Sequence, residues 1–194
     1  MTENTFLIVG LGNPGREYKD NRHNVGFMLV DRLMVRFNAH MSRLQAKALV
    51  ASLNYEGKKL IFAKPQTYMN LSGQSIQGLA HFYKIPLENM IVAHDDLDLP
   101  FGTIRIRPGG GPGGQKGVAS TIERLGSKDF PRLRIGIGRP PGRMDPKDYV
   151  LQDFTRADLP LLSEILDRAA DAVLAFALEG LNQAMNRFNG DIQA

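Results

Sequence analysis

The chain has 194 residues, contains no cysteine and carries a formal net charge of +4. Its length fits one domain with a sizeable core, and the lack of cysteine excludes disulfides, cysteine–zinc sites and a cysteine nucleophile. The first residues show no basic segment before an apolar one, and no apolar run approaches about 20 residues, so we expect neither a signal peptide nor a membrane span. The sequence pI of about 9.4 fits an anionic partner such as nucleic acid, or simply a solvated basic surface.

The first part of the chain predicts a strand, a tight turn, a polar loop and a helix. The apolar run Phe6–Val9 predicts a buried strand, and residues 12–15 (Gly-Asn-Pro-Gly) provide strong turn chemistry. A polar loop then ends at His23, and an apolar stripe with helical spacing predicts a helix over residues 24–37. This segment therefore places one histidine at the start of a helix.

Strands and helices alternate through the rest of the chain. The predicted elements are a hairpin of strands at 47–53 and 59–63, a helix around 76–83, strands at 90–94 and 103–107, a glycine-rich loop at 109–117 with a short helix ending near Gly126, a strand at 132–138, a loop at 140–146, and helices after a Thr155 cap that break at Gly180. This alternation predicts an α/β fold: a single-domain three-layer sandwich over residues 1–194, with a mixed, largely parallel sheet and helices on both faces.

Two glycine-rich segments resemble nucleotide-binding motifs without meeting their requirements. Gly10, Gly12 and Gly15 match the dinucleotide fingerprint, but that motif needs a helix that begins among its glycines, and a polar loop follows here. A tight turn that directs Asn13 is the better interpretation. The loop at 109–117 lacks the Gly-Lys-Ser/Thr of a P-loop, although Lys116 could still reach a phosphate. A flexible surface loop is the alternative.

Polar side chains follow three of the predicted strands. Asn13, Asn70 and Asp95 each come after a strand. If these strands are parallel neighbours, their carboxyl ends meet at one edge of the sheet, and the three side chains converge there with His23. A histidine with a carboxylate partner can act as a general base, and two amides can bind a carbonyl and its developing oxyanion. With no cysteine and no Gly-x-Ser-x-Gly motif, water is the expected attacking group, and an activated carbonyl such as an ester is the expected substrate.

Other polar residues have simpler interpretations. His40, His81 and His94 are expected to be structural or exposed. The acidic run around Asp95 has no recognised metal-ligand spacing, so we expect no metal, and Asp98 could equally cap or fix a loop. Four arginines alternate along two strands and could clamp phosphate or form a salt-bridged sheet face: Arg105, Arg107, Arg132 and Arg134.

These segments together resemble the bacterial peptidyl-tRNA hydrolase family. The resemblance covers nearly the whole chain through the blocks LIVGLGNPGREYKDNRHNVGF, KPQTYMNLSG, VAHDDLDLPFG, the glycine-rich loop, FPRLRIGIGRPPG and YVLQDF. It implies a monomeric, cytoplasmic α/β enzyme without metal or cofactor. Such an enzyme hydrolyses the ester between a peptide and tRNA and so recycles tRNA from prematurely released peptidyl-tRNA. Its contacts would be with the 3′ CCA end and the acceptor-stem phosphates.

The resemblance also implies roles for individual residues. His23 is similar to the family's general base, Asp95 to its stabilising partner, Asn13 to the residue that discriminates N-blocked from free aminoacyl groups, and Asn70 to the peptide and oxyanion contact. Positions that line the family's substrate cleft match Tyr18, Tyr68 and Met69. A basic pair that clamps a tRNA phosphate matches Arg107 and Arg134.

One block departs from the family pattern. The family usually has Gly-Gly-His-Asn-Gly where this chain has Gly-Gly-Gln-Lys-Gly at residues 113–117, and Pro112 replaces a further family histidine. Lys116 cannot accept a hydrogen bond as the usual asparagine does, but it could pair with a phosphate near the tRNA 3′ end. Two alternatives remain: a weak or inactive RNA-binding homologue, such as the splicing cofactors of plant organelles, and a hydrolase of small acyl esters that never meets RNA.

Overall fold

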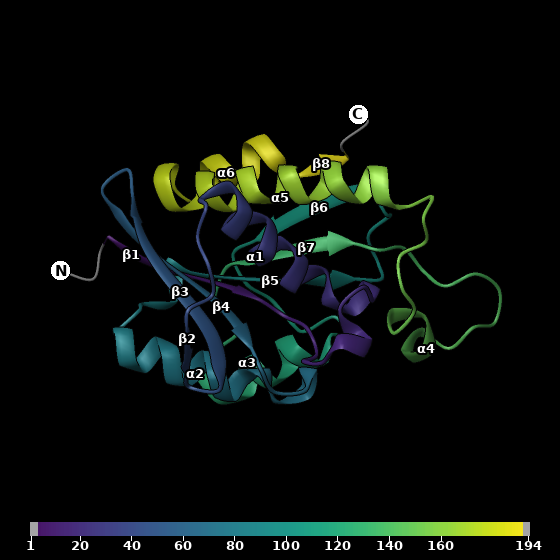
Figure 1. The fold of residues 1–194 in the computed structure, drawn as a ribbon, viewed down its shortest axis with the longest axis horizontal. Coiled ribbons are helices and arrows are strands. Elements are labelled where there is room, and N and C mark those ends of the chain that lie inside the picture. The colour runs from purple at the N-terminus through teal and green to yellow at the C-terminus, as the bar shows by residue number, and fades with distance from the viewer. Residues whose placement is uncertain (1–3, 192–194) are drawn as a thin grey trace.

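The computed structural model describes residues 4–191, whose strands form one eight-stranded sheet in the order β2-β3-β4-β1-β5-β7-β6-β8 (Figure 1). The strands are β1 (Thr5–Gly10), β2 (Arg43–Gln45), β3 (Ala48–Tyr55), β4 (Lys58–Pro65), β5 (Met90–Asp96), β6 (Thr103–Arg107), β7 (Arg132–Gly136) and β8 (Gly190–Asp191). The four central strands, β4, β1, β5 and β7, run parallel, and the outer strands pair antiparallel. The predicted mixed sheet is confirmed, with its parallel part confined to the centre.

Helices cover both faces of this sheet. The α-helices are α1 (Val25–Arg36), α2 (Ser72–Tyr83), α3 (Lys116–Leu125), α4 (Pro146–Val150), α5 (Leu159–Glu179) and α6 (Leu181–Phe188). Single 3₁₀ turns are η1 (Arg16–Tyr18), η2 (Arg22–Asn24), η3 (Met69–Leu71) and η4 (Leu87–Asn89). Figure 1 shows α1, α5 and α6 over one face, α2 and α3 over the other, and α4 set apart beyond the carboxyl ends of the central strands. The predicted three-layer sandwich is therefore confirmed.

The buried strand β1 divides the core into two layers. Phe6 and Ile8 pack into the cluster under α1, α5 and α6, whereas Leu7 and Val9 pack into the cluster under α2 and α3. A strand that is buried on both faces reads as a continuous apolar run rather than an alternating one. The expectation of a single domain extends over residues 1–194, which include termini outside the described range, and it stays a prediction.

Several element boundaries differ from those predicted. Strand β5 continues through Asp96, so Asp95 lies within the strand end rather than after it, and β7 ends at Gly136. Thr155 does not cap a helix: α5 begins at Leu159, and the backbone N–H of Thr155 donates to the Asp158 carboxylate over 2.7 Å. The predictions missed the short elements β2, α4 and β8. The predicted break at Gly180 is confirmed between α5 and α6.

The glycines after β1 allow α1 to approach the sheet very closely. A Cβ atom on Gly10 would lie 2.0 Å from the carbonyl oxygen of Gly26 in α1, and one on Gly12 would lie 2.7 Å from the Phe27 ring. Neither distance is possible for a real side chain, so the helix packs here only because both residues are glycine. The motif thus serves helix–strand packing, as the glycine of a close contact does elsewhere, and it places η2 at the edge of the sheet.

Candidate active site

The carboxyl ends of three adjacent strands open into one cleft. Strand β1 lies between β4 and β5 and is parallel to both. The end of β5 and the segments that follow β1 and β4 bring Asp95, Asn13, His23 and Asn70 to the wall of a cleft of about 750 Å³. The convergence predicted from the strand ends is therefore observed, and the physical reason is the shared direction of the three strands.

His23 and Asp95 form a part-buried hydrogen-bonded pair. The His23 Nδ1 atom lies 2.8 Å from Asp95 Oδ2, and Asp95 is only 4% exposed. A carboxylate can only accept, so the proton of the neutral imidazole resides on Nδ1. The Nε2 atom then carries a lone pair, and His23 lines the cleft. This is the arrangement that a general base requires.

Arg22 holds the His23 turn against the segment that follows α4. Its guanidinium donates to the carbonyl oxygens of Gln152 and Asp153 at 3.3 and 3.0 Å and lies 4.5 Å from the centre of the Tyr149 ring. Nearby, the Asn21 side chain donates to the Asp153 carboxylate over 2.6 Å. These contacts attach η2 to the segment that follows α4 from outside the cleft.

Asn13 is held in one orientation by its neighbours. Its backbone N–H donates to Asn24 Oδ1 and its carbonyl accepts from Asn24 Nδ2, both over 2.9 Å. Its side-chain oxygen accepts from the backbone N–H of Met69 over 2.8 Å. Because that oxygen already accepts a hydrogen bond, the Nδ2 donor is the end of the amide left for the cleft.

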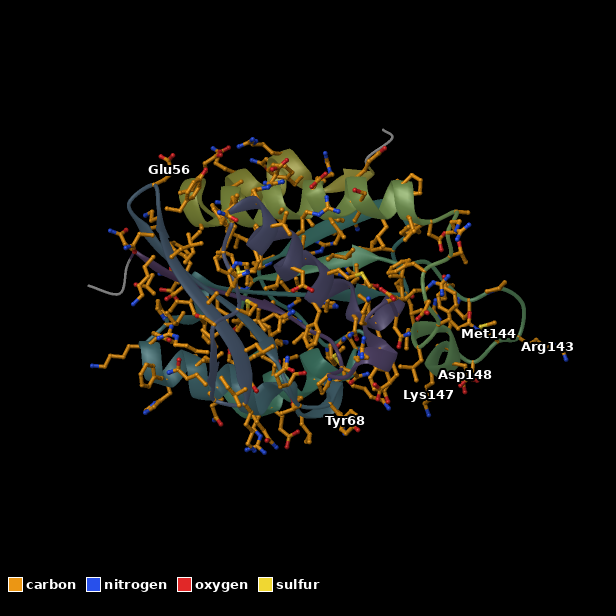
Figure 2. The ribbon with its side chains drawn as sticks, in the orientation of Figure 1. Glu56, Tyr68, Arg143, Met144, Lys147 and Asp148 are labelled. Atoms are coloured by element: carbon orange, nitrogen blue, oxygen red, sulfur yellow. The ribbon has the colours of Figure 1, made fainter. Side chains whose placement is uncertain are left out.

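Three consecutive residues of the 3₁₀ turn region at η3 form another part of the wall: Tyr68, Met69 and Asn70. Met69 is buried, whereas Asn70 and Tyr68 are exposed, and Figure 2 shows the Tyr68 side chain projecting outward from the molecule. An exposed amide beside an exposed aromatic ring can bind a peptide through hydrogen bonds and apolar contact.

Gln115 joins the start of α3 to the His23–Asp95 pair. Its Nε2 donates to Asp95 Oδ1 over 3.0 Å and lies 3.2 Å from Met69 Sδ, while its Oε1 accepts from the Val118 backbone N–H over 2.8 Å. The glutamine is therefore the N-cap of α3 and also the second hydrogen-bond donor to the carboxylate. It is 8% exposed.

The rim of the cleft combines paired and unpaired charges. Asp96 pairs with Arg134 over 2.6 Å, and Asp98 accepts from Arg139 Nε over 3.1 Å. Lys116 begins α3 and Lys147 lies in α4, and within residues 4–191 neither ammonium group has an ion-pair partner. Figure 2 shows Lys147 projecting outward from α4. The rim can therefore offer two cations to an anionic ligand.

The four arginines of β6 and β7 share one face of the sheet. Arg105 is the cross-strand neighbour of Arg134, and Arg107 that of Arg132. Arg132 is buried and donates to the carbonyl oxygens of Gly111 and Lys128 at 3.1 and 2.8 Å, which anchors the glycine-rich loop. Burial lowers the pKa of Arg132, and the neighbouring Arg134 charge lowers it further. Arg132 is thus structural, while Arg105 and Arg107 point the same way without a hydrogen bond or ion pair among the described residues.

His94 is buried and does not line the cleft. Its Nδ1 donates to the Asp95 carbonyl oxygen over 2.8 Å, and the residue is 3% exposed. Burial lowers the pKa of His94 because the imidazolium would lose its hydration, although the hydrogen bond and nearby carboxylates act in the opposite direction. His94 is therefore held neutral, as expected of a structural histidine.

The comparisons with known proteins point to one family. The family model described as peptidyl-tRNA hydrolase matches residues 7–194. The chain belongs to the peptidyl-tRNA hydrolase family. The peptidyl-tRNA hydrolase of Carboxydothermus hydrogenoformans is 50% identical over 184 residues, which cover 95% of this chain and 98% of that one. That of Pseudarthrobacter chlorophenolicus is 47% identical over 191 residues, with 97% of each chain covered. The crystal structure of peptidyl-tRNA hydrolase from Acinetobacter baumannii superposes with a TM-score of 0.92 at 36% identity, covering 100% of this chain and 99% of that one.

The structure of this family member brings most of the predicted site residues together. The cleft is lined by Asn13, His23, Tyr68, Met69, Asn70, Asp95 and Lys116. Tyr18 lies half-buried in η1 and is not part of the cleft wall, and Arg107 and Arg134 lie on the sheet face outside that wall. The roles of all these residues stay predictions.

Sequence reasoning missed four residues that shape the site of this family member. They are Asn24, which fixes Asn13; Arg22, which fixes the His23 turn; Gln115, which binds Asp95; and Lys147 of α4, which lines the rim. Asn24 and Arg22 flank His23 in the sequence, which was a usable signal. Gln115 and Lys147 lie on segments far from His23 in the sequence.

Within residues 4–191, no helix is long and apolar enough to cross a membrane, and no group of three or more candidate ligand side chains is arranged to hold a metal.

Proposed function

We propose that this chain hydrolyses the ester bond between a peptide, or an N-blocked amino acid, and tRNA, with His23 activating water. The observation that carries the proposal is the His23–Asp95 hydrogen bond of 2.8 Å at the wall of a cleft that also holds Asn13 and Asn70. A general base beside two amides fits the attack of water on a carbonyl, and it needs no nucleophilic side chain.

The proposed reaction moves one proton through His23. Its Nε2 takes a proton from water as the oxygen attacks the ester carbonyl, and Asp95 stabilises the imidazolium that forms. The Asn70 amide donates to the oxyanion of the tetrahedral intermediate. As the carbon–oxygen bond to the tRNA ribose breaks, the imidazolium returns the proton to the departing ribose oxygen. The Nδ2 donor of Asn13 binds the carbonyl of the acylated amino group, and Tyr68 and Met69 contact the peptide.

The proposed tRNA contacts use cations that the fold leaves available. Asp96 accepts from Arg134 Nε, so the two terminal amino groups of this guanidinium can bind a phosphate together with Arg107. Lys116, at the exposed start of α3, would meet a phosphate near the CCA end, where the helix dipole adds to its charge. We place the reaction in the cytoplasm, where tRNA is recycled for translation, with the enzyme acting as a monomer. Tyr18 would contact substrate only if the bound tRNA reaches η1.

The direct test is turnover of N-acetyl-aminoacyl-tRNA beside the unblocked aminoacyl-tRNA, with a chelator present. Release of the blocked amino acid alone is expected. His23→Ala should lose about 10²- to 10⁴-fold in kcat, the usual contribution of a general base, while its tRNA affinity stays close to that of the wild type. Wild-type turnover by His23→Ala would refute the mechanism.

The same assay separates the alternatives. An RNA-binding homologue would bind tRNA and release nothing, and Lys116→Asn would then be the variant to test for recovered turnover. A hydrolase of small esters would act on a short acyl ester with no dependence on salt. Phosphate-dependent binding should instead weaken steeply as salt rises, because each phosphate contact releases counterions.

A further inference from the structure

We propose that Gln115 is a positioning residue for the reaction: its amide fixes the orientation of the Asp95 carboxylate and thereby the tautomer of His23. Gln115 stands where the resemblance described above has histidine, and in this chain the contact to Asp95 is made by the glutamine amide. The kinetic part of the inference rests on the proposed function. The structural part concerns the protein alone.

The orientation of the Gln115 amide has only one solution. The Val118 backbone N–H points at one end of the amide over 2.8 Å, and a backbone N–H can only donate, so that end is the oxygen Oε1. The other end, Nε2, must then face Asp95 Oδ1 at 3.0 Å. The start of α3 therefore sets the direction of the donor, independently of any substrate.

The two oxygens of Asp95 consequently have different partners. Gln115 Nε2 donates to Oδ1 and His23 Nδ1 donates to Oδ2 at 2.8 Å. An amide cannot ionise in the working pH range, so the donor to Oδ1 is constant. With one oxygen bound by this fixed donor, the carboxylate cannot rotate without breaking a hydrogen bond in a site that is 4% exposed. The remaining oxygen stays aimed at the histidine and keeps its proton on Nδ1.

The arrangement predicts an unusual outcome for Asp95→Asn. The oxygen of the new amide would face Gln115, because two NH₂ groups facing each other would leave buried donors unpaired. Its NH₂ group would then face His23 and require an acceptor at Nδ1. The imidazole would carry its proton on Nε2 and could not accept one from water. We expect kcat to fall at least about 100-fold, with KM nearly unchanged, because the base is in the wrong tautomer.

Gln115→Glu should restore the correct tautomer in the Asp95→Asn background. The new carboxylate accepts from Val118 as before and also from the NH₂ group of the asparagine, whose oxygen then turns to His23 Nδ1. We expect the double variant to exceed Asp95→Asn in kcat at least about tenfold, by the tautomer requirement. Gln115→Glu alone should lower kcat, because two carboxylates would face each other. The matched control is Gln77→Glu in the Asp95→Asn background, since Gln77 is exposed on α2 and binds the Arg124 carbonyl.

The tautomer is read without substrate, from the ¹⁵N chemical shifts of the His23 ring nitrogens in labelled protein. We expect the His23 ring proton on Nδ1 in the wild type, on Nε2 in Asp95→Asn, and on Nδ1 again in the double variant Asp95→Asn with Gln115→Glu. It is overturned if Asp95→Asn keeps the proton on Nδ1, or if the Gln77→Glu control rescues as well as Gln115→Glu. Thermal unfolding of each variant checks that it is folded. If no variant or wild type releases peptide while the tautomer changes as expected, the proposed function fails and the positioning role stands.

Discussion

Replacing Asn13 with aspartate should reverse the substrate preference of the enzyme. The Asn13 oxygen accepts from the Met69 backbone N–H over 2.8 Å, so the amide presents a donor to the cleft. A donor pairs with the carbonyl of an N-acylated amino acid, but it has nothing to offer a free ammonium group, which also only donates. Asn13→Asp keeps the acceptor for Met69 and exchanges the donor in the cleft for a negative oxygen.

The size of the effect follows from the hydrogen bonds exchanged. The blocked substrate loses one hydrogen bond worth about 0.5–1.5 kcal/mol, and its carbonyl is left facing an acceptor, which costs a further 1–3 kcal/mol or so. A total of about 1.5–4.5 kcal/mol lowers kcat/KM for that substrate roughly 10- to 2,000-fold. The unblocked substrate gains a charged hydrogen bond of about 1.5–3 kcal/mol, so its KM should fall roughly 10- to 100-fold.

The assay compares kcat and KM for N-acetyl-aminoacyl-tRNA and the matching unblocked aminoacyl-tRNA. Asn13→Ala is the control for simple loss of the donor: it should lower kcat/KM for the blocked substrate about 2- to 13-fold and bring no gain for the unblocked one. Asn13→Ala also leaves the Met69 N–H unpaired, so its unfolding temperature must be measured alongside. If Asn13→Asp retains the wild-type preference for the blocked substrate, the orientation deduced for this amide does not govern recognition.

Three further outcomes are expected. Arg22→Ala should lower the free energy of unfolding by about 3 kcal/mol, because it removes two charge-assisted hydrogen bonds from a buried site, and should lower the unfolding temperature by about 6–12 °C in calorimetry. The pKa of His94 is lowered in the folded protein, so the unfolded chain takes up the proton first, and stability should fall as the pH drops below about 6.5. Between pH 6.5 and 5.5 this group alone can lower the free energy of unfolding by up to about 1 kcal/mol. When the free energy of unfolding is measured with denaturant at a series of pH values, His94→Gln should remove this decrease. The control His81→Gln, at an exposed position, should leave it unchanged. Arg134→Gln should raise KM for the tRNA substrate and reduce the salt slope of log KM by about 1, whereas Arg187→Gln, on the opposite layer, should change neither.

The pattern of elements was predictable because it depends on local properties of the chain. Phe6–Val9 is apolar throughout because β1 is covered on both faces, and residues 103–107 alternate because only one side of β6 meets the α5 layer. The failures occurred where tertiary contacts decide. Strand β2 has only three residues and pairs with β3, and α4 is a single short helix capped by Asp145 after a loop rich in proline and glycine. Thr155 looked like a cap because a carboxylate follows it by three positions, yet that carboxylate binds the Thr155 N–H from one residue before α5.

The sequence by itself determined the order of strands and helices, the glycines that let α1 meet β1, and the kinds of side chain that follow each central strand. Parallel strands must end at the same edge, so His23, Asp95, Asn13 and Asn70 could be grouped before any coordinates existed. The tertiary structure alone decided how these groups are oriented. The amide of Asn13 is set by a residue 56 positions away, and the carboxylate of Asp95 by one 20 positions away. Hydrogen-bond direction depends on angles and distances between segments that local propensity does not encode, so the chemistry was readable from residue types and its geometry only from the fold.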